Sequence, residues 1–214
     1  MTHMKNAGAG KIIEDIAAVI VANKAYLSKI DGLIGDGDHG VNMAKGFSRA
    51  ADRIAGREVS LSEAMSILSD VLMSEIGGSM GPLYGVMFAE MAEAIEATPD
   101  IDAETFAAML RAGQDGIFTI GSAKVGDKTL MDVLIPATAS FAQAIAEGVA
   151  FRAALPRMTA AAEAGRDSTI NLVAQIGRSA RLGERSRGVL DAGAASCCMI
   201  LTGLANGVDE RLDG

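Results

Sequence analysis

Several residue types are scarce in this sequence. Tryptophan is absent and aromatic residues make up only 4% of the 214 residues, which disfavours a strand-rich fold. The two cysteines, Cys197 and Cys198, are adjacent, so they do not form a disulfide framework. Lys and Arg (19) are outnumbered by Asp and Glu (27), which argues against a nucleic-acid-binding surface. No apolar run is long enough to cross a membrane and no signal-peptide pattern is evident. We therefore expect a cytoplasmic protein with no nucleic-acid or membrane partner.

Alternating apolar and polar residues, the pattern of a half-buried strand, are missing too. Apolar residues recur instead at helical spacing in nearly every segment. The first such stripe consists of Ile12, Ile13, Ile16, Val19, Ile20 and Leu27, with Asn23 as a polar interruption. Half of the residues are apolar, and 214 residues suffice for one core. We expect a single all-α domain over residues 1–214, with roughly eight helices.

Capping signals indicate where later helices begin. Ser60 and Glu63 form a capping box, and Asp102 can cap the next segment. Thr129 with Asp132 is the pattern of another cap, and Pro136 then either kinks that helix or falls in its first turns. Two further helices are expected at about residues 156–175 and 192–206.

The segment "IDGLIGDGDHGVNMAKGF", residues 30–47, concentrates carboxylates and glycines. Asp31, Asp36 and Asp38 lie within eight positions, and carboxylates this close repel one another unless a cation is present. One interpretation is a solvated turn with an aspartate cap. An EF-hand is excluded, because its glycine and final glutamate positions hold Val41 and Phe47. The other interpretation is a Mg²⁺ site shared with phosphate oxygens.

Three other glycine-rich connections could approach an anion closely. They are "GGSMGPLYG" (77–85), "GSAKVGDKT" (121–129) and "RLGERSRGVLDAGA" (181–194). Each is by default only a helix connection. The arginines at positions 178, 181, 185 and 187 are either a solvated basic face or the source of one phosphate contact. "GAGK" near the start is not a Walker A loop, since Ile12 replaces Ser or Thr. A Ser–His–Asp triad would have to use His39, which the carboxylates crowd.

Taken together and in this order, "GDGDHGVNMAKGF", "GGSMGPLYG", "GDKTLMD" and "LGERS…DAGAAS" resemble the nucleotide-binding L subunit family of dihydroxyacetone kinase. The resemblance covers the chain from Asp31 to about Leu201. It implies a closed barrel of about eight antiparallel amphipathic helices, with the nucleotide site at one end. It also implies two Mg²⁺ ions and either ADP or ATP.

The resemblance assigns residues to both ligands. The metal carboxylates would be Asp31, Asp36 and Asp38. The nucleotide contacts would be His39, Gly40, Val41, Asn42, Ser79, Met80, Gly121, Leu130, Arg178, Asp191, Ala192 and Gly193. No residue of this chain is expected to act as a catalytic nucleophile, because the family holds its ketose on a histidine of a separate K subunit. That subunit is the expected partner. The phosphoryl donor would be ATP or a phosphohistidine protein of the sugar phosphotransferase system.

The sequence departs from the family at two loops. Gly-Ala-Ser-Gly or Gly-Ser-Ser-Gly is replaced by Gly78-Ser79-Met80-Gly81, so a thioether stands where a hydroxyl is usual. His-Gln-Asp-Pro-Gly-Ala is replaced by residues 189–194, Val-Leu-Asp-Ala-Gly-Ala. Two alternatives to a dihydroxyacetone kinase subunit therefore remain: a kinase subunit for another short ketose, such as a four-carbon sugar, and an ADP-binding partner of a transcription regulator.

Overall fold

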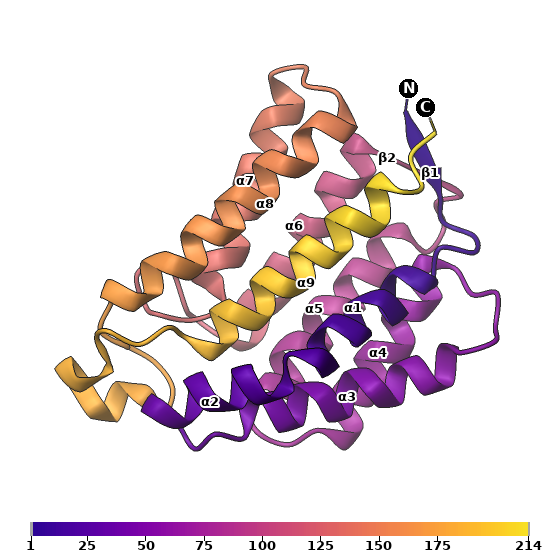
Figure 1. Ribbon diagram of the computed structural model, residues 1–214. Coiled ribbons are helices and arrows are strands. Elements are labelled where there is room, and N and C mark those ends of the chain that lie inside the picture. Colours follow the sequence, from indigo (N-terminus) through magenta and orange to yellow (C-terminus); the bar gives the residue numbers. More distant parts are fainter. Residues whose placement is uncertain (1, 214) are drawn as a thin grey trace.

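A computed structural model describes residues 2–213, and within them the chain is mostly helical (Figure 1). The α-helices are α1 (Lys11–Ala22), α2 (Lys24–Ile34), α3 (His39–Ile54), α4 (Leu61–Glu75), α5 (Met80–Ile95), α6 (Ala103–Ile120), α7 (Met131–Ala146), α8 (Phe151–Ser168) and α9 (Ala192–Asp209). The segment between α8 and α9 contains two 3₁₀ helices, η1 (Thr169–Asn171) and η2 (Ser179–Ser186). The all-α class expected from the sequence is confirmed.

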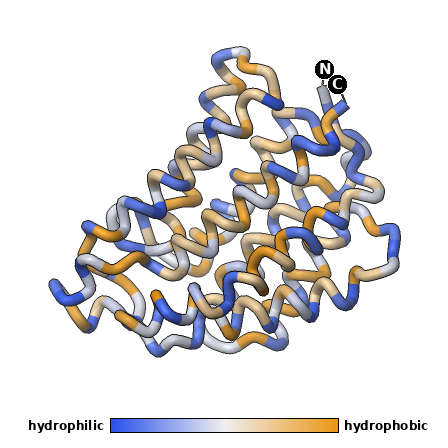
Figure 2. Tube along the Cα trace, viewed as in Figure 1, coloured by the Kyte–Doolittle hydropathy of each residue, from blue (hydrophilic) through white to orange (hydrophobic). Residues whose placement is uncertain are grey.

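The helices α3 to α9 pack in chain order around a main hydrophobic core, and a small second cluster lies between α2 and α9. From α3 to α9 each helix contacts the next, and α1 contacts both α3 and α9. Helix α2 packs against α3, α9 and η2. Figure 2 shows hydrophobic and hydrophilic residues interspersed along each helix, as expected when one face of the helix is buried. Phe106, Phe141 and Phe151 meet in the core, with the rings of the first two 5.0 Å apart.

Two short strands were not expected from the sequence. β1 (His3–Lys5) and β2 (Asp100–Asp102) pair antiparallel, with Met4 opposite Ile101. Three residues are too few for an alternating pattern to stand out. The pair ties the start of the chain to the loop before α6. The two ends of the chain lie close together (Figure 1), and the Asp213 N–H donates to the His3 carbonyl.

The first apolar stripe, from Ile12 to Leu27, predicts one continuous helix, and this prediction is wrong. The chain breaks between α1 and α2 at Asn23, whose side-chain amide donates to the Val19 carbonyl at 2.8 Å. Such a bond competes with the helical ladder, so the polar interruption of the stripe marks a helix boundary.

Some of the predicted helix starts agree with the structure and others do not. Ser60 and Asp102 cap α4 and α6 as expected, through bonds from the amides of Glu63 and Thr105. The Asp132 carboxylate accepts from the Thr129 amide at 2.7 Å, immediately before α7. The helix expected at 156–175 instead spans Phe151–Ser168, with Pro156 inside it. No helix that the structure describes is long and apolar enough to span a membrane.

Candidate functional site

The N-termini of alternate helices meet at one end of the molecule. Helices α3, α5, α7 and α9 begin on the same side, because a single helix returns the chain between each of them and the next. A cavity of about 240 Å³ is lined by residues at all four of these starts: His39, Met80, Leu130 and Ala192. The first amides of a helix have no intrahelical acceptor, and the helix dipole is positive there. This end of the protein therefore favours an anion.

The three aspartates of the glycine-rich loop converge beside that cavity. Asp31 comes from the last turns of α2, and Asp36 and Asp38 from the connection to α3. One carboxylate oxygen of each lies within 4.8 Å of the others. Gly37 permits this turn because its φ is +78°, a conformation that favours glycine. The Asp31 carboxylate also accepts from the His39 amide at 3.3 Å, which fixes it relative to α3.

The chemistry of this cluster suits a hard cation. Three carboxylates at this spacing repel one another, and an ion bound to their oxygens would offset that repulsion. Oxygen ligands are those that Mg²⁺ takes, usually together with phosphate oxygens. The carboxylates line a cavity of about 140 Å³ together with Asn42, Ser79 and Arg178. The residues present therefore fit a metal-bound phosphate group.

Arg178 is the member of the arginine cluster that reaches this cavity. Its guanidinium forms an ion pair with the Asp36 carboxylate. Arg187 instead pairs with Glu184, and Arg181 and Arg185 are exposed. A guanidinium at the edge of an anion site can bind phosphate oxygens in place of a carboxylate.

A larger, apolar cavity adjoins the acidic one. It measures about 460 Å³ and is lined mainly by Leu83, Ile117, Ile120, Gly121, Leu130, Met131 and Ile176. Ser79 lines this cavity, the acidic cavity and the one between the helix starts. The three cavities are thus contiguous around Ser79. A ligand with a flat apolar part and a charged tail would match this arrangement, with the tail toward the aspartates.

A chain of buried hydroxyls orients His39. Its Nε2 lies 2.9 Å from Ser196 Oγ, which lies 2.8 Å from the Tyr84 hydroxyl. Tyr84 also donates to the Gly193 carbonyl at 3.0 Å. Burial lowers the pKa of His39, against an opposing effect of Asp31, and raises the pKa of Tyr84. Ser196 is fully buried and Asp31 meets the His39 backbone rather than its ring, so the group is not a nucleophilic triad.

Most predicted site residues line these cavities. They are Asp31, Asp36, Asp38, His39, Asn42, Ser79, Met80, Gly121, Leu130, Arg178, Asp191, Ala192 and Gly193. Gly40 and Val41 do not. Gly40 faces α2, where an added Cβ would lie 2.1 Å from the Lys24 carbonyl oxygen, so glycine there permits close helix packing. The Val41 side chain is 46% exposed. Only their first-turn amides remain as ligand contacts to be tested.

Sequence reasoning also missed residues of the site. The apolar lining from α5, α6 and Ile176 carries no motif. Lys128, Tyr84 and Ser196 lie inside or next to quoted motifs, yet nothing in those motifs indicates where their side chains point. Asp191 was predicted only as a nucleotide contact, and the structure shows that its carboxylate also accepts from the Ala194 amide and so caps the start of α9. Burial raises the pKa of Asp191 to about 6.

Comparison with known proteins gives consistent matches. Residues 33–206 match the DAK2 domain family. The chain is 36% identical to the "PEP-dependent dihydroxyacetone kinase, ADP-binding subunit DhaL" of Escherichia coli, over 86% of this chain and 89% of that protein. It is 32% identical to an L-erythrulose kinase of Pectobacterium atrosepticum, over 86% of this chain but 32% of that protein.

Solved structures agree on the fold. The dihydroxyacetone kinase of C. freundii superposes with a TM-score of 0.71 at 24% identity, over 92% of this chain and 34% of that one. The complex of the same kinase with AMP-PNP and Mg²⁺ superposes with a TM-score of 0.68 at 23% identity and similar coverage.

Proposed function

Because the chain belongs to the DAK2 domain family and is a DhaL-type relative within it, we propose that it is the nucleotide-binding subunit of a short-ketose kinase. As such it is a phosphotransferase subunit, acting on an alcohol group of a ketose. The observation that carries the proposal is the contiguous site around Ser79, with a carboxylate cluster at one end and an apolar cavity at the other.

Each part of that site has a role in the proposal. Asp31, Asp36 and Asp38 hold two Mg²⁺ ions, which when bound would neutralise charge on the phosphate oxygens. Arg178 and the amides at the starts of α3, α5 and α9 orient the phosphates. The apolar cavity takes the base. Since positioning and electrostatics dominate phosphoryl transfer, this chain needs no covalent nucleophile.

The proposed partner is a K-type subunit that holds the ketose. The C. freundii kinase is about three times as long as the region that this chain matches, whereas the E. coli relative is a subunit of similar length. The ketose-binding part would therefore come from a separate chain. We also propose that the ring of helices α1 and α3–α9 is the closed barrel of this family, since α9 returns to contact α1.

ADP is the proposed resident nucleotide. The E. coli relative is named as PEP-dependent and ADP-binding, and a Lactococcus lactis relative, 37% identical, as PTS-dependent. In this version ADP stays bound and is rephosphorylated by a phosphohistidine protein. ATP that exchanges at each turnover is the alternative donor.

Calorimetric titration with ADP, with and without Mg²⁺, tests the nucleotide site, and we expect binding that depends on Mg²⁺. Nucleotide retained through dialysis would support the coenzyme version, and rapid loss would favour ATP. Phosphorylation of dihydroxyacetone by this chain together with a K subunit tests the activity. The absence of Mg²⁺-dependent nucleotide binding would contradict the proposal.

A four-carbon ketose is the second candidate substrate. The match to an L-erythrulose kinase favours it, and erythrulose offered beside dihydroxyacetone in the same assay decides between them. A regulatory, ADP-binding role is favoured by Met80 and by the altered loop before α9. This regulatory role would be supported if the chain binds nucleotide but no K subunit supports turnover.

A further inference from the structure

Lys128 is a buried cation that the proposed phosphoryl transfer does not use. Lys128 is only 1% exposed, although it belongs to the loop before α7. Its φ is +64°, which makes it the one non-glycine residue with a left-handed backbone among residues 2–213. Such a conformation costs free energy in a residue with a side chain, so the surroundings must hold it in place.

The ammonium group of Lys128 is satisfied entirely by main-chain carbonyls. Nζ donates to the carbonyl oxygens of Thr169 at 2.5 Å, Leu172 at 3.3 Å and Val189 at 2.5 Å. A lysine ammonium has three N–H donors, so each has an acceptor and none remains for a phosphate. Burial lowers the pKa of Lys128 and Arg187 adds to this, whereas Asp191 and Asp132 oppose it. Although Lys128 lines the cavity between the helix starts, its ammonium group is bonded to these carbonyls, so it acts as a structural clamp rather than a ligand contact.

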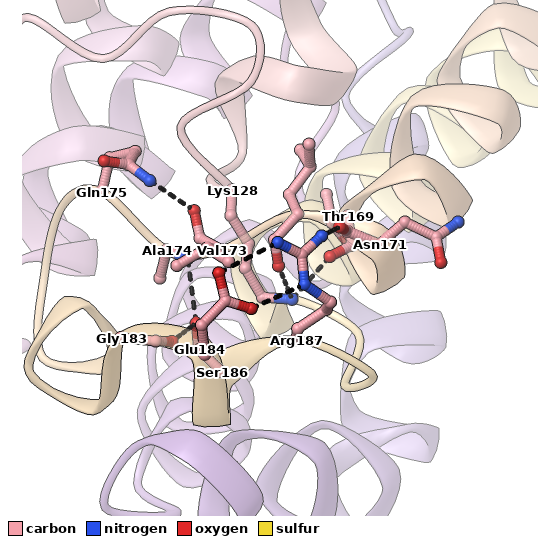
Figure 3. A network of polar contacts seen from close by, with 11 residues as sticks. Lys128, Thr169, Asn171, Val173, Ala174, Gln175, Gly183, Glu184, Ser186 and Arg187 are labelled. Carbon is pink, nitrogen blue, oxygen red and sulfur yellow. Dashed lines mark hydrogen bonds and ion pairs between the residues drawn. The ribbon is translucent and has the colours of Figure 1, made fainter.

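The three carbonyls belong to the two ends of one segment. Residues 169–189 leave α8, line the proposed nucleotide cavities and return to α9. Figure 3 shows Lys128 beside Thr169, where this segment begins. Ile176 in its middle lines the apolar cavity and Arg178 lines the acidic one. Two more bonds secure it, from the Gln175 amide to the Asp127 carbonyl and from the Gly188 amide to the Ile170 carbonyl. Lys128 is thus the side chain that ties both ends of the segment to the start of α7.

We propose that Lys128 is a positioning residue that clamps segment 169–189 over the nucleotide cavities and thereby sets how long a bound nucleotide is retained. The proposal rests on the proposed function only in that the ligand is a nucleotide. Without the clamp, Ile176 and Arg178 would be carried on a segment free to move away from the ligand. Because the clamp is within the protein, it would act whether or not nucleotide is bound.

The experiment compares Lys128→Met with the wild type and with Lys124→Met. Lys124 is an exposed lysine four residues earlier in the same loop, so its replacement removes the same charge without removing the clamp. The first measurement is limited trypsin digestion without nucleotide. Trypsin cleaves after the four arginines of the segment, at 178, 181, 185 and 187. We expect cleavage after these arginines to increase in Lys128→Met about tenfold or more beyond any increase at the other sites. Lys124→Met should match the wild type.

The second measurement is the dissociation rate of ADP in the presence of Mg²⁺. We expect it to rise about tenfold or more in Lys128→Met. Lys128→Arg keeps a multi-donor cation and should lie closer to the wild type in both measurements. If Lys128→Met does not fold, Lys128→Gln, with two donors and no charge, should give intermediate values.

An increase in cleavage that is the same at all sites would show that the segment is not loosened in particular and would overturn the proposal. Wild-type cleavage of the segment together with a wild-type ADP dissociation rate would overturn it as well. A wild-type protein that binds no ADP would contradict the proposed function alone, because the digestion needs no nucleotide.

Discussion

The carboxylate cluster and the Lys128 clamp are two charged regions at the same end of the molecule. They differ in whether groups of the protein itself offset their charge. Asp31, Asp36 and Asp38 bring like charges within 4.8 Å, and protein groups offset only part of that charge, through Arg178 and the His39 amide. Lys128 is a single charge with three carbonyl acceptors. In our proposal an added cation completes the first region, whereas the second is complete within the chain.

This difference determines whether a mutation that removes a charge raises or lowers the stability of the protein without ligand. Removing a negative charge from the cluster relieves repulsion in the protein alone and weakens binding of a metal-bound ligand. Removing the positive charge of the clamp leaves three carbonyls without their donor, which costs free energy with or without ligand. A mutation in the carboxylate cluster should therefore weaken ligand binding without lowering stability. A mutation in the clamp should lower both.

The largest expected effect is the loss of stability in Lys128→Met. Leaving a buried polar group without its donor costs about 1–3 kcal/mol, and three carbonyls lose their donor here, so we take about 3 kcal/mol for the change. We expect the free energy of unfolding, measured in urea, to fall by about that amount. Lys124→Met should leave it unchanged. A fall of less than about 1 kcal/mol would show that water replaces the ammonium without loss and would remove the contrast between the two regions.

Asp38→Asn tests the opposite behaviour. Asp38 is exposed and precedes α3, and asparagine serves equally well at such a position. Without ligand we expect the melting temperature to stay the same or rise, since repulsion within the cluster decreases. With Mg²⁺ and ADP, the mutant should lose most of the stabilisation that the wild type gains. Thermal melting of both proteins, with and without Mg²⁺–ADP, measures the two effects. An equal gain from ligand in the mutant would mean that Asp38 holds no metal.

Arg178→Ala should have a smaller effect that is confined to binding. Loss of one charge-assisted contact to phosphate would cost about 1.5–3 kcal/mol, or roughly a ten- to hundredfold weaker affinity for ADP. Its exposed ion pair with Asp36 contributes little to folding, so helicity and melting without ligand should not change. Titration calorimetry and circular dichroism check the two parts. Unchanged ADP affinity would exclude Arg178 from the site.

The sequence predicted the helical core well and its local interruptions less well. Stripes of apolar residues predict helices because the same residues must be buried, as Ile12, Ile16 and Ile20 are. The break at Asn23 depends on one side-chain bond to the Val19 carbonyl, and the β1–β2 pair depends on residues almost a hundred positions apart. Such contacts leave little trace in a local pattern.

In the site, too, one part was predicted from the sequence and another was not. Its acidic cluster was predicted because like charges were adjacent in the sequence, and the turn at Gly37 then brings them together. The Lys128 clamp was not predicted. Its partners are main-chain carbonyls 41, 44 and 61 residues away, and any residue type presents such a carbonyl. The motifs indicated which loops form the site but not which side chain holds them together.

Asp191 lies between the two regions and should give the smallest effect. Its pKa is raised to about 6 mainly by burial; Lys128 lowers it, whereas Asp132 and Asp31 raise it. The unfolded chain would have a value near 3.8, so between about pH 4 and 6 the folded state holds a proton that the unfolded state releases. The contribution of this group to stability must therefore increase as the pH falls through 6.

Asp191→Asn isolates that contribution, because asparagine keeps the cap on α9 but cannot titrate. We expect the wild type to gain about 1 kcal/mol over the mutant between pH 7.5 and pH 5, measured as the difference between their unfolding free energies at each pH. Lys128→Met should enlarge this gain, since the cation that lowers the Asp191 pKa is lost, whereas Mg²⁺ bound near Asp31 should reduce it. A gain that responds to neither change would mean that burial and the Ala194 amide set the Asp191 pKa and that neither charged region acts on it.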